Sequence, residues 1–350
     1  MKHRFASILL ALSIFPLQIA SAQFSLPTPD VSIIAEPSLP EPNSQLRLVA
    51  ESSLLDLSRA TITWTVDGKT TLSGVGEKET IITVGGAGVE TKVSVTVSFL
   101  GESGSDSLSL IPGTVDLLFE GSGYTPPLYK GRALPSPGTT LRLVAIAHVS
   151  SRSGPVAADQ LIYTWRQDGE VLGSISGRGR SSATVPAPSL FDTSDISVEV
   201  RTADGIAGAR TSVRIPAIDP HVTLYVNHSL YGILYYRALR DRDALPDLEA
   251  TISAVPYFVA ASSPRDTLLR YEWSVNGTPL SASSSAANEI TINAVGASGP
   301  ATLSLRLTSS LNFFLDAQHS WTLSFAQRSM GNGTTLSPVA PVDAFHTKTN

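Results

Sequence analysis

The residue types best suited to recognition chemistry gather in one short stretch of the last third of the chain. Four of the nine tyrosines fall within twelve residues, and two arginines follow them: Tyr225, Tyr231, Tyr235, Tyr236, Arg237 and Arg240. Tyrosine and arginine are favoured in protein contact surfaces, and an exposed tyrosine ring can also stack on a sugar. One hypothesis is a binding site for a protein or a glycan at Tyr231, Tyr235, Tyr236 and Arg237. The alternative is a structural element, because 233–239 repeats the pattern of 127–134.

Residue patterns that carry catalysis or hold a metal are missing from the sequence. The six histidines are scattered, and none stands at ligand spacing with a carboxylate. The chain has no cysteine, no Gly-x-Ser-x-Gly elbow and no Ser-x-x-Lys motif. Residues 74–78 are glycine-rich but lack the Lys-Ser or Lys-Thr pair of a phosphate loop. In 240–243, Arg-Asp-Arg-Asp, the charges are expected to neutralise each other. We therefore expect no catalytic residue, no cofactor and no metal site.

A tryptophan recurs with the same surroundings at three places, 101 and then 108 residues apart. Apolar residues alternate around each tryptophan, and an Asp-Gly or Asn-Gly pair begins three residues after it. The three tryptophans are Trp64, Trp165 and Trp273, and the pairs are 67–68, 168–169 and 276–277. The alternation predicts a strand that delivers the indole to a core between two sheets, and the pair predicts a tight hairpin turn. The spacing is the length of one β-sandwich domain.

Further strands keep the same order around each tryptophan. Segments in which apolar residues alternate with polar ones precede and follow it at matching distances, which is the pattern of a strand with one buried face. The segments before the tryptophans are 46–50, 141–145 and 248–252; those after them are 82–84, 183–185 and 290–292, then 93–97, 196–200 and 303–307. Residues 101–113 begin with a Gly/Ser-rich stretch, expected to be a linker, and 107–111 could close the first module. The proline-flanked linker 216–220 is expected to hold the second and third modules semi-rigidly.

With these residues the chain resembles PKD-like and other bacterial immunoglobulin-like repeats, whose core strand carries an aromatic-x-Trp-x-x-[Asp/Asn]-Gly motif. The resemblance implies an all-β protein of three tandem immunoglobulin-like (PKD-like) β-sandwich domains. It also implies the usual role of such modules, as spacers, stalks or adhesive parts of surface proteins.

The N-terminus has the features of a secretory signal peptide. Lys2, His3 and Arg4 precede an apolar stretch at 5–19, and the small residues at 20–22 form a cleavage site. We expect a signal peptide at 1–22, domains at 23–112, 113–217 and 218–326, and a tail at 327–350 that is rich in Gly, Pro, Thr and Ser. If the signal is not cleaved, it is the only expected contact with a membrane. Whether or not the signal is cleaved, we expect an exported protein that is extracellular, on the cell surface or periplasmic.

The charge of the chain narrows the choice of partner. Without Lys2 and Arg4 the mature chain has 23 basic and 30 acidic residues, a net charge of −7. A negative protein is a poor partner for nucleic acid or an anionic membrane. We therefore expect an exported, non-enzymatic structural or interaction protein that spaces or presents a binding surface. The alternative is a carbohydrate-binding protein that uses the Tyr/Arg segment of the third domain.

Overall fold

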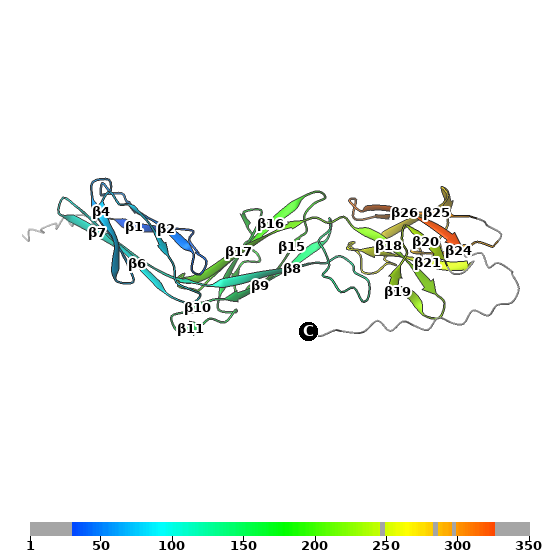
Figure 1. The fold of residues 1–350 in the computed structure, drawn as a ribbon, viewed down its shortest axis with the longest axis horizontal. Coiled ribbons are helices and arrows are strands. Elements are labelled where there is room, and N and C mark those ends of the chain that lie inside the picture. Colours follow the sequence, from blue (N-terminus) through cyan, green and yellow to red (C-terminus); the bar gives the residue numbers. More distant parts are fainter. Residues whose placement is uncertain (1–29, 246–248, 283–285, 296–298, 326–350) are drawn as a thin grey trace, which may run out of the picture. The chain divides into compact units, whose positions relative to one another are not determined.

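The chain is all-β, as the computed structural model shows (Figure 1). The structure describes residues 30–245, 249–282, 286–295 and 299–325, and within these ranges every element of regular secondary structure is a strand. The predicted signal peptide and the predicted tail lie outside the described residues. Within the described ranges, no helix is long and apolar enough to cross a membrane. The chain divides into two compact units, which are described separately below.

The first unit packs two antiparallel sheets around one core. One sheet has the order β1 (Val31–Glu36), β2 (Gln45–Ser52), β5 (Glu79–Thr83). The other has the order β4 (Lys69–Val75), β3 (Thr61–Val66), β6 (Thr91–Phe99), β7 (Glu102–Pro112). The Gly/Ser-rich stretch expected to begin a linker is therefore part of β7, which pairs with β6 from Glu102 to Leu110. The buried residues of this core include Leu46, Leu48, Ile62, Trp64 and Val95.

The second unit contains two cores, and the first of these repeats the same plan. One sheet has the order β8 (Thr114–Gly121), β9 (Thr140–His148), β15 (Ser182–Pro186). Facing it are β12 (Ile162–Gln167), β16 (Thr193–Arg201) and β17 (Ala207–Pro216), with the short β13 (Glu170–Val171) and β14 (Gly177–Arg178) pairing on β12. A small hairpin joins β10 (Ser150–Ser151) and β11 (Gly154–Pro155). The core between these sheets buries Trp165 and Tyr163.

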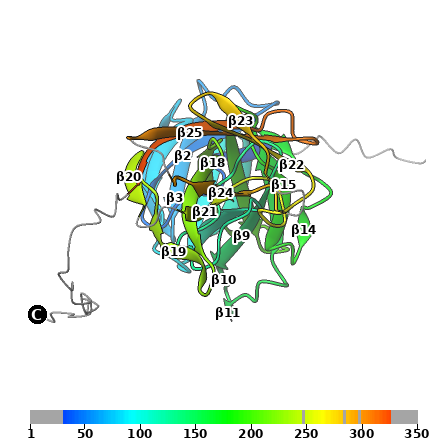
Figure 2. The ribbon, with the colours of Figure 1, turned by 90° about the vertical axis from the view of Figure 1, so that its right-hand side faces the viewer.

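The other core of the second unit lies between a four-stranded and a five-stranded sheet, which face each other in Figure 2. The four-stranded sheet has the order β19 (Gly232–Ala238), β18 (His221–His228), β21 (Glu249–Tyr257), β24 (Glu289–Asn293). The five-stranded sheet has the order β20 (Arg242–Leu245), β26 (Asp316–Phe325), β25 (Ala301–Ser309), β22 (Leu269–Val275), β23 (Thr278–Leu280). Trp273 and Trp321 are both buried in this core. Three sandwiches of this kind confirm the predicted fold class, while the exact domain boundaries stay predictions.

Each repeated tryptophan is fixed by the same hydrogen bond. The indole nitrogen donates to a backbone carbonyl 13 to 15 residues further along the chain. The bonds join Trp64 to Glu77 at 2.9 Å, Trp165 to Arg180 at 2.8 Å and Trp273 to Ala287 at 3.0 Å. A buried indole N–H must find an acceptor, and here the connection that follows the hairpin supplies it. The indole thus fills the core and also anchors that connection.

The turn after each tryptophan strand has a second role besides reversing the chain. The first turn residue has a positive φ in all three copies: 48° at Asp67, 52° at Asp168 and 47° at Asn276. Each is followed by a glycine with positive φ, as a type I′ hairpin requires. The Oδ1 atom of each also accepts a hydrogen bond from a backbone N–H at the start of the neighbouring strand: Lys92, Asp195 and Thr302. The short Asp or Asn side chain therefore joins the hairpin to the next strand.

A segment between β8 and β9 connects the two cores of the second unit. Tyr124 exchanges backbone hydrogen bonds with Val259 at 2.8 Å and with Phe258 at 2.6 Å, and its side chain packs against the core that contains Trp273. The Ser136 hydroxyl donates to the Phe258 carbonyl, and the Asn312 side-chain amide donates to the carbonyl of Pro137 at 2.7 Å. The proline-flanked linker is therefore not the only connection, and the two sandwiches share packing as well as chain.

Candidate binding surface

The structure divides the four residues of the predicted site between two environments. Tyr231 precedes β19, and Tyr235, Tyr236 and Arg237 lie on β19, at the edge of its sheet. The exposed fractions of Tyr231 and Tyr236 are 77% and 83%. The Tyr235 ring instead packs against the ring of Tyr225 in the neighbouring strand, with their centroids 5.4 Å apart. Successive strand residues point to opposite faces, so Tyr235 supports the sheet while Tyr236 is available to a partner.

Tyr235 belongs to a cluster of aromatic side chains. The hydroxyls of Tyr225 and Tyr257 are 2.6 Å apart. The Tyr257 ring also stacks on His221 at 4.8 Å and meets the edge of Tyr129 at 5.8 Å. Burial raises the pKa of Tyr257 and Tyr235, and it raises the pKa of Tyr124 to about 12, because a buried phenolate would lose its hydration. These phenols remain protonated well above their ordinary range.

The tyrosine cluster predicts that the two units respond differently to alkali. Folded-state pKa values above the usual 10 leave stability intact below about pH 10 and reduce it as the pH rises further. All nine tyrosines lie at or beyond Tyr124, so the first unit has none. We expect the second unit to unfold first above pH 10, and Tyr257→Phe to shift its transition to higher pH. Tyrosinate absorbance and near-ultraviolet circular dichroism measure this. Simultaneous unfolding of both units at the wild-type midpoint would contradict it.

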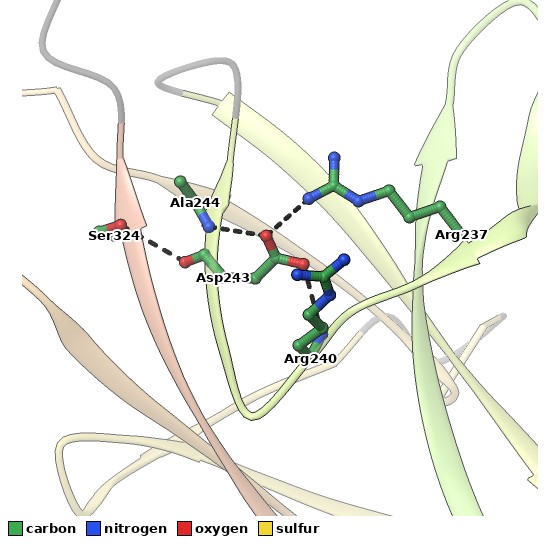
Figure 3. Close-up of polar contacts among 5 residues, drawn as sticks. All are labelled: Arg237, Arg240, Asp243, Ala244 and Ser324. Atoms are coloured by element: carbon green, nitrogen blue, oxygen red, sulfur yellow. Dashed lines mark hydrogen bonds and ion pairs between the residues drawn. The ribbon is translucent and has the colours of Figure 1, made fainter.

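Arg237 is held in position by a buried carboxylate (Figure 3). The side chain of Asp243 is only 7% exposed, and its Oδ1 accepts hydrogen bonds from Arg237 Nη2 at 2.7 Å and from the Ala244 N–H at 2.9 Å. The Oδ2 atom of Asp243 accepts a hydrogen bond of 3.3 Å from the Arg240 N–H. The Ser324 hydroxyl donates to the backbone carbonyl of Asp243 at 3.4 Å. The guanidinium remains 58% exposed. It is thus a fixed cation at the position that follows Tyr236 on β19.

The sequence predicted that the charges of residues 240–243 neutralise each other, and this prediction is wrong. Asp243 pairs with Arg237, and Asp241 pairs with His319 at 2.8 Å. No local pattern signals the role of Asp243, because its burial depends on β20 pairing in parallel with β26, whose residues are about 80 positions away. In the part of the chain that the structure describes, no group of three or more His, Cys, Asp or Glu residues could hold a metal ion.

Removing the charge of Asp243 should weaken its hydrogen bonds to Arg237, Ala244 and Arg240 and destabilise the second unit. We expect Asp243→Asn to lower the free energy of unfolding of the second unit by about 2 kcal/mol, since hydrogen bonds to a buried charged group weaken. Asp316→Asn is the matched control. The ion pair of Asp316 with Arg306 is about half exposed on both sides, so water screens it and its loss should cost clearly less than the loss at Asp243. Urea unfolding of the two variants measures the difference, and equal losses would show that Asp243 is no more than a surface charge.

No protein-family model and no curated protein matches the sequence. Solved structures do resemble it. The three N-terminal domains of the highly immunogenic outer capsid protein of bacteriophage RB49 are 13% identical, with 85% of this chain and 98% of that chain covered, at a TM-score of 0.25. The fibronectin(III)-like modules of Clostridium thermocellum CbhA are 15% identical, with 53% and 94% covered, at a TM-score of 0.26.

A third similar structure is Bacteroides ovatus SGBP-B in complex with a mixed-linkage heptasaccharide. It is 14% identical, with 85% of this chain and 70% of that chain covered, at a TM-score of 0.23. These TM-scores are too low for the matches to support an argument. The class of this chain, a tandem immunoglobulin-like β-sandwich protein, therefore rests on its own sheets, cores and strand registers. The finer PKD-like resemblance stays a prediction.

Proposed function

We propose that the chain is an exported, non-enzymatic interaction protein that presents the surface around β19 to a partner at the cell surface or in the periplasm. One observation carries this proposal: Tyr231 and Tyr236 expose most of their rings, and the guanidinium of Arg237, the residue that follows Tyr236 on β19, is held by Asp243. Leu230, 81% exposed, extends the apolar part of this surface. Large aromatic residues and arginine contribute most of the binding energy in many interfaces, and the ion pair with a buried carboxylate keeps the arginine positioned in advance.

A glycan is the second candidate partner. Tyr236 lies in a strand, so its exposed ring is held on a rigid element, which suits stacking on a sugar ring. A protein partner would use the same ring as an anchor in a pocket. The two partners differ in what else is needed, because a protein interface must also bury the neighbouring Leu230 and a sugar need not.

The experiment measures binding of the mature chain, residues 23–350, to envelopes of the cells that produce it and to a glycan array. We expect Tyr231→Ala with Tyr236→Ala to weaken binding at least about tenfold, the size expected for lost aromatic anchors. Ile81→Ala is the control, since Ile81 is 65% exposed on β5 of the first unit and should have no effect. Leu230→Ser should weaken binding to a protein but not to a glycan. Unchanged binding of the double variant would reject this surface, and turnover of a polymer would reject the non-enzymatic role.

A further inference from the structure

Strand β26 has an uncovered edge over its first half. β25 pairs along one side of β26 from Asp316 to Leu323, whereas β20 covers the other side only from Thr322 onward. The Thr322 N–H points to the β20 side, where it donates to the Asp241 carbonyl at 2.7 Å. Because backbone groups alternate along a strand, those of Ser320 and Gln318 point to the same side. Within the described residues, no strand pairs with them there.

The uncovered edge borders a groove of about 340 Å³ in the second unit. On one side the groove is lined by the start of β26, and on the others by the start of β18 and the loop that precedes β16. The lining residues that matter here are Phe191, Asp219, Val222, Phe314 and Gln318. A chain that added a strand to the uncovered edge would run about 4.8 Å from β26, along the side where the groove lies.

Phenylalanines are exposed at the rim of this groove. Phe191 is 90% exposed, Phe314 is 55% exposed, and the neighbouring Phe313 is 94% exposed. Phe191 also has a φ of 62°, a left-handed conformation that is unfavourable for a bulky residue. A strained backbone that presents an apolar ring to water gives the folded chain no benefit by itself. Together with Phe313 and Phe314, it indicates a contact surface for an apolar side chain.

The charged side chains around the groove determine which ligand charge it favours. Asp316 is neutralised by Arg306 at 2.7 Å, and His319 faces Asp241. Asp219 lines the groove and Asp192 follows Phe191, and neither has an ion pair among the described residues. The groove therefore favours lysine or arginine in the ligand, in keeping with the net negative charge of the chain.

We propose that the groove binds an extended, basic segment of a partner protein, which adds a strand to the uncovered edge of β26. The segment's backbone pairs with Gln318 and Ser320, an apolar side chain packs against Phe191 and Phe314, and a lysine or arginine faces Asp219. Strand addition uses backbone hydrogen bonds for affinity and alternate side chains for selectivity. This site is separate from the surface around β19 and does not depend on the function proposed for it.

A random linear peptide library displayed on phage tests the proposal with the mature chain as bait. Selected peptides should alternate apolar residues with lysine or arginine. They should bind the double variant Phe191→Ser/Phe314→Ser at least about tenfold more weakly, and the Tyr236→Ala variant equally well. Gln318→Pro removes the outward N–H and should lower affinity about tenfold, whereas Gln318→Ala, which keeps it, should not. N-methylation of alternate amides in a selected synthetic peptide should have the same effect, without any change to the protein fold.

Three results would overturn the proposal. Acidic peptides or no enriched peptides would reject a basic extended ligand. Equal binding to the double variant would place the ligand elsewhere. A concentration-dependent dimer in sedimentation that the double variant abolishes would assign the groove to a second copy of this chain.

Discussion

Trp165→Ala is expected to lower the free energy of unfolding of the second unit by about 4 kcal/mol. The ring is fully buried, and such truncations cost about 3–5 kcal/mol because the cavity does not collapse. The variant also leaves the Arg180 carbonyl without the indole donor that now lies 2.8 Å away. Urea unfolding followed by circular dichroism measures the change, and the transition of the first unit, which does not contain Trp165, should stay in place.

Trp165→Phe is the matched control for the hydrogen bond. It keeps most of the apolar volume but removes the donor, so its loss should be about half that of the alanine variant. A loss below about 1 kcal/mol for Trp165→Ala would contradict the account, because a ring that costs so little to remove does not support a core.

Gly123→Ala is expected to separate the two cores of the second unit. A Cβ atom on Gly123 would lie 2.6 Å from the carbonyl carbon of Phe258. Because the clashing atoms belong to the backbone, a change of side-chain rotamer cannot relieve the clash. The clash falls where Tyr124 pairs with Phe258 and Val259, so this pairing must open. We expect a loss of about 3 kcal/mol, the upper range for overpacking, and two unfolding transitions where the wild-type unit has one.

Gly173→Ala provides the comparison for that experiment. No heavy atom lies within 4 Å of a Cβ built on Gly173, and its φ is not in the left-handed region, so alanine should be neutral. Differential scanning calorimetry resolves the number of transitions. If Gly123→Ala unfolds in one transition at the wild-type temperature, the contacts of Tyr124 do not couple the two cores.

Local patterns were sufficient to predict the strands around each tryptophan and the turns that follow them. Alternation located the strands around each tryptophan, and the Asp-Gly and Asn-Gly pairs located the three hairpins. These features depend on residues that are close in sequence, where side-chain period and turn conformation follow from the residue type. The same reasoning took residues 101–106 for linker, because serine and glycine dominate there. Pairing with β6 overrides that composition.

The candidate site was predicted only in part, because its geometry depends on distant segments. The sequence marks Tyr235 and Tyr236 alike, but only the position of Tyr225 on β18 decides which ring is covered. Asp243 is buried because β20 lies beside β26. The contact between Ser136 and Phe258 spans 122 residues. Contacts between residues so far apart produce no periodic pattern in a single sequence. The burial of Asp243 and the contacts of the segment between β8 and β9 could therefore not be predicted.

The most direct test of the three-core account is acrylamide quenching of tryptophan fluorescence in the mature chain. All four tryptophans have exposed fractions of 3% or less. We predict blue-shifted emission that acrylamide barely quenches until urea unfolds the protein, with the same result in variants that retain only Trp64, Trp165 or Trp273. Efficient quenching of any one of these rings in the folded protein would contradict a sandwich built around it.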